Sequence, residues 1–184
     1  MQYDYLTDLP NRMLLKDRLD HALAVATRYS RSLAVLFVNL DHFKQVNDTA
    51  GRAVGDRVLQ TIPGRLLDCV RSSDTVSRYE GDEFVILLSE IDPSRSLMPS
   101  VNKILAAIAA LQDDTPQAFQ ITASIGVSIF TQDGRDGETL IQRADAAMYW
   151  AKQNGRNRIA TVTSSIGNSN FRAAITIPGS ASIQ

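Results

Sequence analysis

Apolar residues recur along the chain at two different spacings, which predict helices and strands in turn. Residues 12–30 carry apolar side chains at helical spacing among charged ones. Residues 33–40 form an almost continuous apolar run, which is typical of a strand covered on both faces. The same patterns predict helices at 56–70, from Asp92-Pro93 to Leu111 and at 137–153, a hairpin at 74–88, and strands at 119–130 and 159–162, with turns at Asn47-Asp48, Gly51 and Gly55.

This order of elements predicts an α+β fold, a ferredoxin-like split-βαβ mixed sheet of five strands flanked by helices. In such a sheet the strand at 33–40 and the hairpin at 74–88 are neighbours at the centre. We therefore expect the end of the first strand, Asn39 to Asp41, to lie close to the hairpin tip at Glu80-Gly81. Palm-type nucleotidyl enzymes gather carboxylates for two-metal chemistry in the same geometry.

The composition of the chain changes near residue 164. Residues 164–184 contain a single charged side chain, Arg172, among many serine, glycine, asparagine and proline residues. Such a stretch is typical of a linker. We predict one domain over residues 1–163 and a linker or C-terminal tail over 164–184, and we expect the chain to be a module of a longer protein.

Charge and cysteine content narrow the classes of function. The 184 residues carry a formal net charge of −1, so no basic field favours a nucleic-acid partner. No apolar run reaches the roughly 18–20 residues that span a bilayer, so we expect no membrane partner for this segment. The single cysteine, Cys69, excludes a disulfide within the chain, and no Cys/His cluster suggests zinc. A cytoplasmic location is the expectation.

The candidate chemistry lies at the hairpin tip. Asp82 and Glu83 follow Glu80-Gly81 directly, so their carboxylates sit at the turn. If the tip faces the end of strand 33–40, it forms a site for hard cations and the phosphates that they carry. The alternative is a solvated acidic turn, and the tip alone does not decide between the two.

Five segments together resemble the GGDEF domains, diguanylate cyclases that join two GTP molecules into cyclic di-GMP. The resemblance covers about residues 4–160. It implies Mg²⁺ or Mn²⁺ as cofactor, and a homodimer in which each chain holds one GTP and each 3′-hydroxyl attacks the other α-phosphate. The five segments are Leu6–Arg12, Asn39–Asp48 with Gly55-Asp56, Tyr79–Phe84, Ser124–Val127, and Ala144–Tyr149 continuing into Lys152–Arg158.

The resemblance also implies roles for single residues. An amide and a carboxylate suit the guanine base, whose N1 and N2 are donors. Each role has a plainer alternative. The Asn47 amide could cap a helix, Asp56 could be an ordinary acid in a first helical turn, and Arg71 with Asp74 could form a solvated turn. The basic residues could simply be solvated. The implied roles are catalytic for Asp82 and Glu83, metal-binding for Asn39, the Leu40 carbonyl and Asp82, guanine-binding for Asn47 and Asp56, triphosphate-binding for Lys44, Lys152 and Arg156, and inhibitory cyclic di-GMP binding for Arg71 and Asp74.

Two positions depart from the family pattern and make it a degenerate Glu-Gly-Asp-Glu-Phe. Asn39 stands where the family has a metal-binding aspartate, so a full negative charge is missing. Glu80 stands where the family has glycine, and adds a charge beside the phosphates, with a backbone cost if its φ must be positive. Asp41 remains, but we expect strand alternation to turn it to the other face of the sheet from residue 39, so that it does not replace Asn39 without a shift of register.

Three hypotheses follow. The first is a regulatory nucleotide-binding module of cyclic di-GMP signalling that binds GTP and is weakly active or inactive as a cyclase. The alternative is a competent diguanylate cyclase. A third, a purely structural dimerisation domain, leaves Asn47, Asp56, Lys152 and Arg156 unexplained. The motifs resemble tandem proteins in which an EAL phosphodiesterase domain follows, so we expect an EAL or other signalling domain as the C-terminal neighbour.

Overall fold

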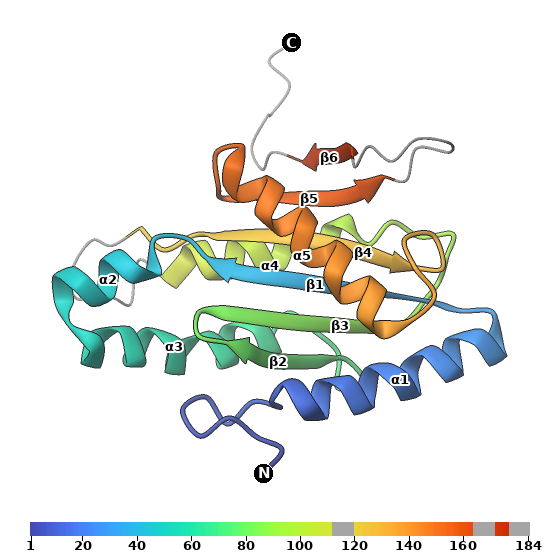
Figure 1. Ribbon diagram of the computed structural model, residues 1–184, viewed down its shortest axis with the longest axis horizontal. Helices are drawn as coiled ribbons and strands as arrows, with labels where there is room; N and C mark the ends of the chain where they lie inside the picture. Colours follow the sequence, from blue (N-terminus) through green and yellow to red (C-terminus); the bar gives the residue numbers. More distant parts are fainter. Residues whose placement is uncertain (112–119, 164–171, 177–184) are drawn as a thin grey trace.

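The computed structural model describes residues 1–111, 120–163 and 172–176. Helices and strands follow one another along the chain as drawn in Figure 1. Their bounds are α1 Arg12–Tyr29, β1 Ser32–Leu40, α2 Phe43–Ala50, α3 Arg52–Leu67, β2 Thr75–Glu80, β3 Glu83–Ile91, α4 Met98–Ala109, β4 Ala123–Phe130, α5 Gly137–Gln153, β5 Arg158–Thr163 and β6 Arg172–Thr176.

The strands form one mixed sheet in the order β2-β3-β1-β4-β5-β6. The pairs β2–β3, β3–β1 and β1–β4 are antiparallel, whereas β4–β5 is parallel. The first four strands in this order reproduce the split-βαβ arrangement, which confirms the predicted fold class. The sequence patterns predicted five strands, and the sixth, β6, pairs antiparallel with β5. It lies inside the predicted tail, most of which is outside the described residues.

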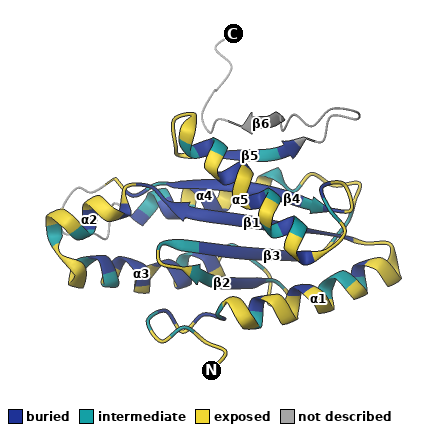
Figure 2. Ribbon diagram, in the orientation of Figure 1, coloured by how far each residue is buried: buried dark blue, intermediate teal, exposed yellow. Residues whose placement is uncertain are grey.

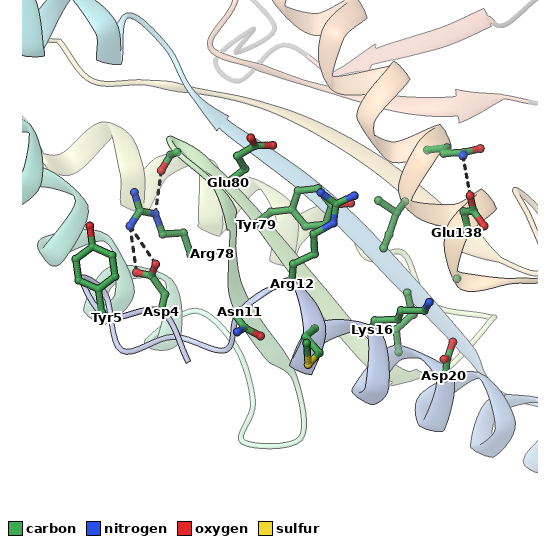
Figure 3. Close-up of a pocket in the computed structure, with 16 residues that line it drawn as sticks. Asp4, Tyr5, Asn11, Arg12, Lys16, Asp20, Arg78, Tyr79, Glu80 and Glu138 are labelled. Carbon is green, nitrogen blue, oxygen red and sulfur yellow. Dashed lines mark hydrogen bonds and ion pairs between the residues drawn. The ribbon is translucent and has the colours of Figure 1, made fainter. Parts of the chain in front are cut away.

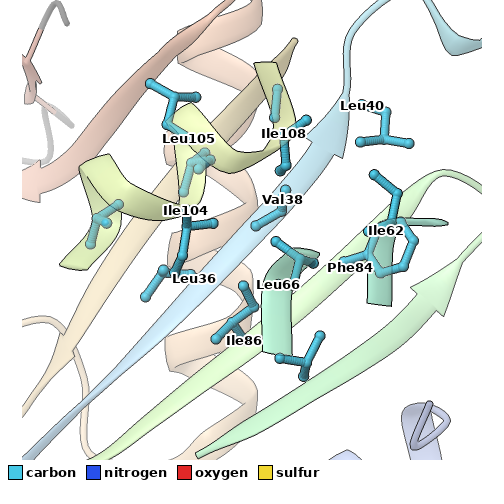
Figure 4. Close-up of a cluster of buried hydrophobic side chains, with 14 of the residues drawn as sticks. Leu36, Val38, Leu40, Ile62, Leu66, Phe84, Ile86, Ile104, Leu105 and Ile108 are labelled. Carbon is cyan, nitrogen blue, oxygen red and sulfur yellow. The ribbon is translucent and has the colours of Figure 1, made fainter. Parts of the chain in front are cut away.

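Helices cover both faces of the sheet, and β1 is buried along its whole length (Figure 2). Even-numbered residues of β1 pack with α2, α3 and α4, where Ile62, Leu66 and Ile104 are fully buried (Figure 4). Odd-numbered residues of β1 pack with α1 and α5. Asn39 continues the odd-numbered row, so its side chain belongs to the face that α1 and α5 cover.

Three helices differ from those predicted from the pattern. Residues 43–50 form the short helix α2, where turns were predicted, because Phe43 and Val46 bury one side of it against the core. The break falls at Gly51, whose φ of 89° only glycine adopts easily. Helix α4 begins at Met98, later than predicted, since Asp92 instead closes a turn by accepting hydrogen bonds from Ser94. Helix α3 begins at Arg52, before the predicted start at residue 56, so the turn predicted at Gly55 is wrong and Gly55 lies buried inside this helix. Most other boundaries agree within a few residues.

Candidate functional site

The hairpin tip and the end of β1 meet as predicted. Asn39 pairs with Glu83 in the β1–β3 ladder, and Glu83 pairs with Glu80 across the hairpin, so the three side chains form a row on one face. The Asn39 amide donates a hydrogen bond of 3.5 Å to the Asp82 carboxylate. The Leu40 N–H donates to the Asp82 carbonyl at 3.2 Å. The predicted metal ligands therefore lie together.

The two acidic residues of the tip are half-buried and close to a lysine. Burial raises the pKa of the Asp82 carboxyl, and the positive charge of Lys152 opposes that rise. Burial also raises the pKa of Glu83, and the negative charges of Asp145, Asp82 and Glu80 raise it further. Lys152, in the last turn of α5, is the basic residue whose charge lowers the pKa of both carboxyls. A cation or a phosphate–cation pair would relieve the repulsion among these acids.

The donor set at this locus fits a magnesium ion that arrives with its substrate. Asn39 is only 7% exposed, and its side-chain oxygen is buried without a hydrogen-bond partner. Among the described residues, no three His, Cys, Asp or Glu side chains are placed to hold a metal ion by themselves. Mg²⁺ is commonly held by one or two carboxylates together with phosphate oxygens. One carboxylate and one orphaned amide oxygen match that pattern, with less charge than two carboxylates.

The predicted guanine-binding residues lie on α2 and α3. Gly55 lies directly beneath the Asn47 side chain, because a Cβ on Gly55 would stand 1.8 Å from the Asn47 oxygen. That oxygen is buried and has no hydrogen-bond partner. Asp56 follows Gly55 and is half-buried, while Lys44 is exposed one turn before Asn47. The pair Asn47 and Asp56 therefore presents one unsatisfied acceptor and one carboxylate in neighbouring positions.

The turn at the hairpin tip accommodates Glu80 without backbone strain. Gly81, not Glu80, takes the positive φ of 52°. The backbone cost that a positive φ at Glu80 would carry is therefore absent. Only the added negative charge of Glu80 remains as a departure from the family pattern. Glu80 is exposed and lies on the same face as Glu83.

Beside the tip, between α1 and the first half of α5, lies a cavity of about 920 Å³ (Figure 3). Arg12 lies over the Tyr79 ring at 4.4 Å. Arg78 pairs with Asp4 at 3.1 Å and donates to the Gly81 carbonyl at 3.0 Å, which ties the N-terminal segment to the tip. The sequence patterns assigned no role to these residues. The signal that could have found them is the segment Leu6–Arg12, which the resemblance included.

The predicted inhibitory pair is only partly free to meet a ligand. The side chain of Arg71 is 59% exposed, whereas that of Asp74 is 3% exposed. The Asp74 carboxylate accepts hydrogen bonds from the N–H groups of Arg71 and Ser89, at 2.9 and 3.0 Å, and pairs with the Arg71 guanidinium at 3.4 Å. Asp74 therefore shapes this turn, and Arg71 is the group that faces solvent.

Asp41 does not replace Asn39, but the reason differs from the one expected. Residues two apart on a strand share a face, so alternation does not turn Asp41 away. Asp41 is instead fully buried, and its carboxylate accepts hydrogen bonds from the hydroxyls of Thr122 and Ser124 and from the Asn157 N–H. Those donors, which come from the segments that lead into β4 and β5, occupy both oxygens of the Asp41 carboxylate.

Comparisons with known proteins decide the family. The family model described as "Diguanylate cyclase, GGDEF domain" matches residues 1–158. The chain belongs to the GGDEF-domain family. This GGDEF domain is 43% identical over 155 residues to the bifunctional diguanylate cyclase/cyclic di-GMP phosphodiesterase MucR of Pseudomonas aeruginosa, covering 84% of this chain and 22% of MucR. It is 39% identical over 158 residues to the diguanylate cyclase DosC of Escherichia coli, covering 85% of this chain and 34% of DosC.

Solved structures show the same fold. The GGDEF domain of TpbB (YfiN) from Pseudomonas aeruginosa matches with a TM-score of 0.80 and 34% identity, over 86% of this chain and 99% of that one. The GGDEF domain of DgcB from Caulobacter crescentus, solved in complex with c-di-GMP, matches with a TM-score of 0.78 and 28% identity, over 87% and 95% of the two chains. The chain spans about a fifth to a third of the first curated relatives. No helix within the described residues is long and apolar enough to cross a membrane.

Proposed function

We propose that this GGDEF domain is a GTP-binding regulatory module of cyclic di-GMP signalling whose own diguanylate cyclase activity is weak or absent. The observation that carries the proposal is Asn39, a neutral amide next to the Asp82 carboxylate at the position where the family has a metal-binding aspartate. GTP binding is supported by the grouping of Asn47 with Asp56 and of Lys152 with the acidic tip.

The proposed binding mode gives each group one task. The guanine edge would donate to the Asn47 oxygen and the Asp56 carboxylate, and thereby satisfy the orphaned acceptor of Asn47. Lys152, Lys44 and Arg156 would contact the triphosphate. A bound Mg²⁺ or Mn²⁺ would neutralise phosphate charge and polarise the α-phosphate for attack by a 3′-hydroxyl.

The same geometry explains why catalysis would be slow. Asp82 and the Asn39 oxygen would hold the metal with one charge fewer than two carboxylates supply. Glu80 adds a negative charge in the row with Glu83, close to where phosphates would lie. Both changes reduce the electrostatic stabilisation of the charge that develops on the attacked phosphate. Turnover would also need a second chain, because one domain holds one GTP, so a homodimer is part of the proposal.

The test is to restore the two family residues. Purified protein is incubated with GTP and Mg²⁺ or Mn²⁺, and cyclic di-GMP is measured by chromatography. We expect little product from the wild type and at least about tenfold more from the double variant Asn39→Asp/Glu80→Gly, which corresponds to about 1.4 kcal/mol of barrier. Glu90→Gly is the matched control, because Glu90 is exposed at the opposite end of β3. A wild-type turnover of order 1 s⁻¹ would refute the proposal and favour the competent cyclase.

A second site is proposed for cyclic di-GMP at Arg71 and Asp74. The side chain of Arg71 is 59% exposed, and its guanidinium, which in this structure donates to the Ser89 carbonyl and pairs with Asp74, can fork onto a phosphate or a guanine edge. Asp74 would act mainly by holding the turn, since its carboxylate is already bonded to the backbone of Arg71 and Ser89. Occupancy of either site would then be relayed to a neighbouring domain, of which a C-terminal EAL domain is the proposed example.

A further inference from the structure

Two segments that lie far from Asp41 in the sequence, Thr122–Ser124 and Asn157, supply three hydrogen-bond donors to its carboxylate. One carboxylate oxygen accepts from the Ser124 hydroxyl at 2.7 Å, and the other accepts from the Thr122 hydroxyl at 2.6 Å and from the Asn157 N–H at 3.0 Å. Asp41 is 0% exposed. A buried carboxylate with three donors stays where they hold it, because an unsatisfied charge there would be costly.

The Asn157 end of this network lies in an unusual turn. Gly155, Arg156 and Asn157 follow α5 with φ values of 118°, 60° and 46°. Asparagine tolerates a left-handed conformation, whereas an arginine such as Arg156 holds one only where surrounding contacts determine it. The contacts here are the Arg156 N–H to the Ala151 carbonyl at 3.0 Å and the Asn157 N–H to Asp41.

The turn carries one of the three proposed phosphate-binding residues and adjoins a second. Arg156 lies inside it, and Lys152 lies in the last turn of α5, next to the acidic tip. Asp41 stands two residues after Asn39 on the same chain. One short stretch of sequence therefore reaches both the metal–phosphate locus and the turn that presents the basic residues.

We propose that Asp41 is a positioning residue for the triphosphate of GTP. It acts through the Asn157 N–H, which fixes the turn that presents Arg156 and the end of α5 that presents Lys152. It touches neither the nucleotide nor the metal. The inference rests on the proposed GTP-binding function, and it assigns to Asp41 a task separate from that of Asn39.

The substitutions that test this differ in which donors they leave satisfied. Asp41→Ala removes all three acceptor contacts. Asp41→Asn can keep its oxygen toward Thr122 and Asn157 while its amide donates to the Ser124 hydroxyl. It should therefore retain the GTP affinity that Asp41→Ala loses. Ser124→Ala, the matched control, removes one buried hydrogen bond of the same carboxylate but leaves the Asn157 contact in place.

The first measurement is the affinity for GTP with Mg²⁺ by calorimetry. We expect Asp41→Ala to bind GTP at least about tenfold more weakly than the wild type, as for the loss of a buried hydrogen bond to a charged group. Asp41→Asn and Ser124→Ala should bind GTP within about twofold of the wild type. In a double-mutant cycle, Asp41→Ala and Arg156→Ala should be less than additive, because both remove the same phosphate contact. Full additivity, or equal losses in Asp41→Ala and Ser124→Ala, would overturn the proposal.

The second measurement does not depend on nucleotide binding or on the alanine variant folding. In wild-type protein, the Asn157 amide should exchange with solvent much more slowly than the Gly155 amide, and its NMR resonance should move in Asp41→Ser, whose hydroxyl ends one bond short of the carboxylate oxygens. Rapid exchange of the Asn157 amide, or an unmoved resonance in Asp41→Ser, would refute the hydrogen bond from this amide to Asp41. If the wild type binds no GTP but protects the Asn157 amide from exchange, the proposed function is refuted, while the hydrogen bond from Asn157 to Asp41 is confirmed.

Discussion

The packing of α5 on β4 leads to a prediction about Gly126, which lies in the strand segment Ser124–Val127. A Cβ at this position would stand 1.9 Å from the Ala144 carbonyl oxygen and 2.3 Å from the Met148 nitrogen. Both atoms belong to the backbone of α5, so no side-chain rotation can relieve the clash. Overpacking a core typically costs 1–3 kcal/mol. We expect Gly126→Ala to lie at the upper end, near 3 kcal/mol, because the whole helix must shift.

The assay is thermal unfolding followed by circular dichroism. For a domain of this size, about 3 kcal/mol lowers Tm by roughly 6–12 °C. Because α5 carries Lys152, GTP affinity should fall as well. The matched control is Gly64→Ala, since a Cβ on Gly64 in α3 meets nothing within 4 Å. That change should be neutral or stabilising by up to about 1 kcal/mol. If the two variants unfold within about 1 °C of each other, the close contact between β4 and α5 is not what requires glycine.

Three further predictions concern ligands. Metal-dependent GTP binding should weaken as the pH falls through the pKa of Asp82, because the protonated carboxyl cannot hold a cation. Burial raises the pKa of Asp82. In a calorimetric titration, the loss of GTP binding should therefore begin at a higher pH than for an exposed aspartate. Gly55→Ala should displace the Asn47 amide and lower GTP affinity by about tenfold with little change in Tm, because the obstructed atom is the end of a flexible side chain; unchanged affinity would remove Asn47 from the guanine site. Arg71→Ala should abolish binding of cyclic di-GMP in calorimetry and leave GTP binding intact, whereas an unchanged cyclic di-GMP affinity would leave Arg71 and Asp74 as an ordinary turn.

Local sequence determined most elements and the identity of the family. The apolar run at residues 33–40 predicted a strand covered on both faces, and β1 is buried along its whole length. The helix at 137–153 was predicted with its observed bounds, and in the structure the Asp136 side chain caps its N-terminus by accepting a hydrogen bond from the Thr139 N–H. The short helix α2 was missed, because its Asn47-Asp48 pair is also typical of turns and eight residues are too few for periodicity to decide.

The sequence also located the candidate site, because motif spacing and split-βαβ topology together bring Asn39 to the hairpin tip. It could not determine what each polar side chain touches. Asp74 was expected to face a ligand, and its carboxylate is instead bonded to the backbone around it. Whether Glu80 or Gly81 takes the positive φ at the turn was also left open by the sequence, and in the structure it is Gly81.

Asp41 shows most clearly where local reasoning ends. Its neighbours in sequence give no sign of its three donors, which come from 81, 83 and 116 residues away. Burial and hydrogen-bond partners are set by which strand ends the fold brings together, and a one-dimensional pattern records only spacing. The sequence therefore determined the family, the sheet and the place of the site, while the tertiary structure decided which acids are free to meet a cation or a phosphate and which ones hold the fold.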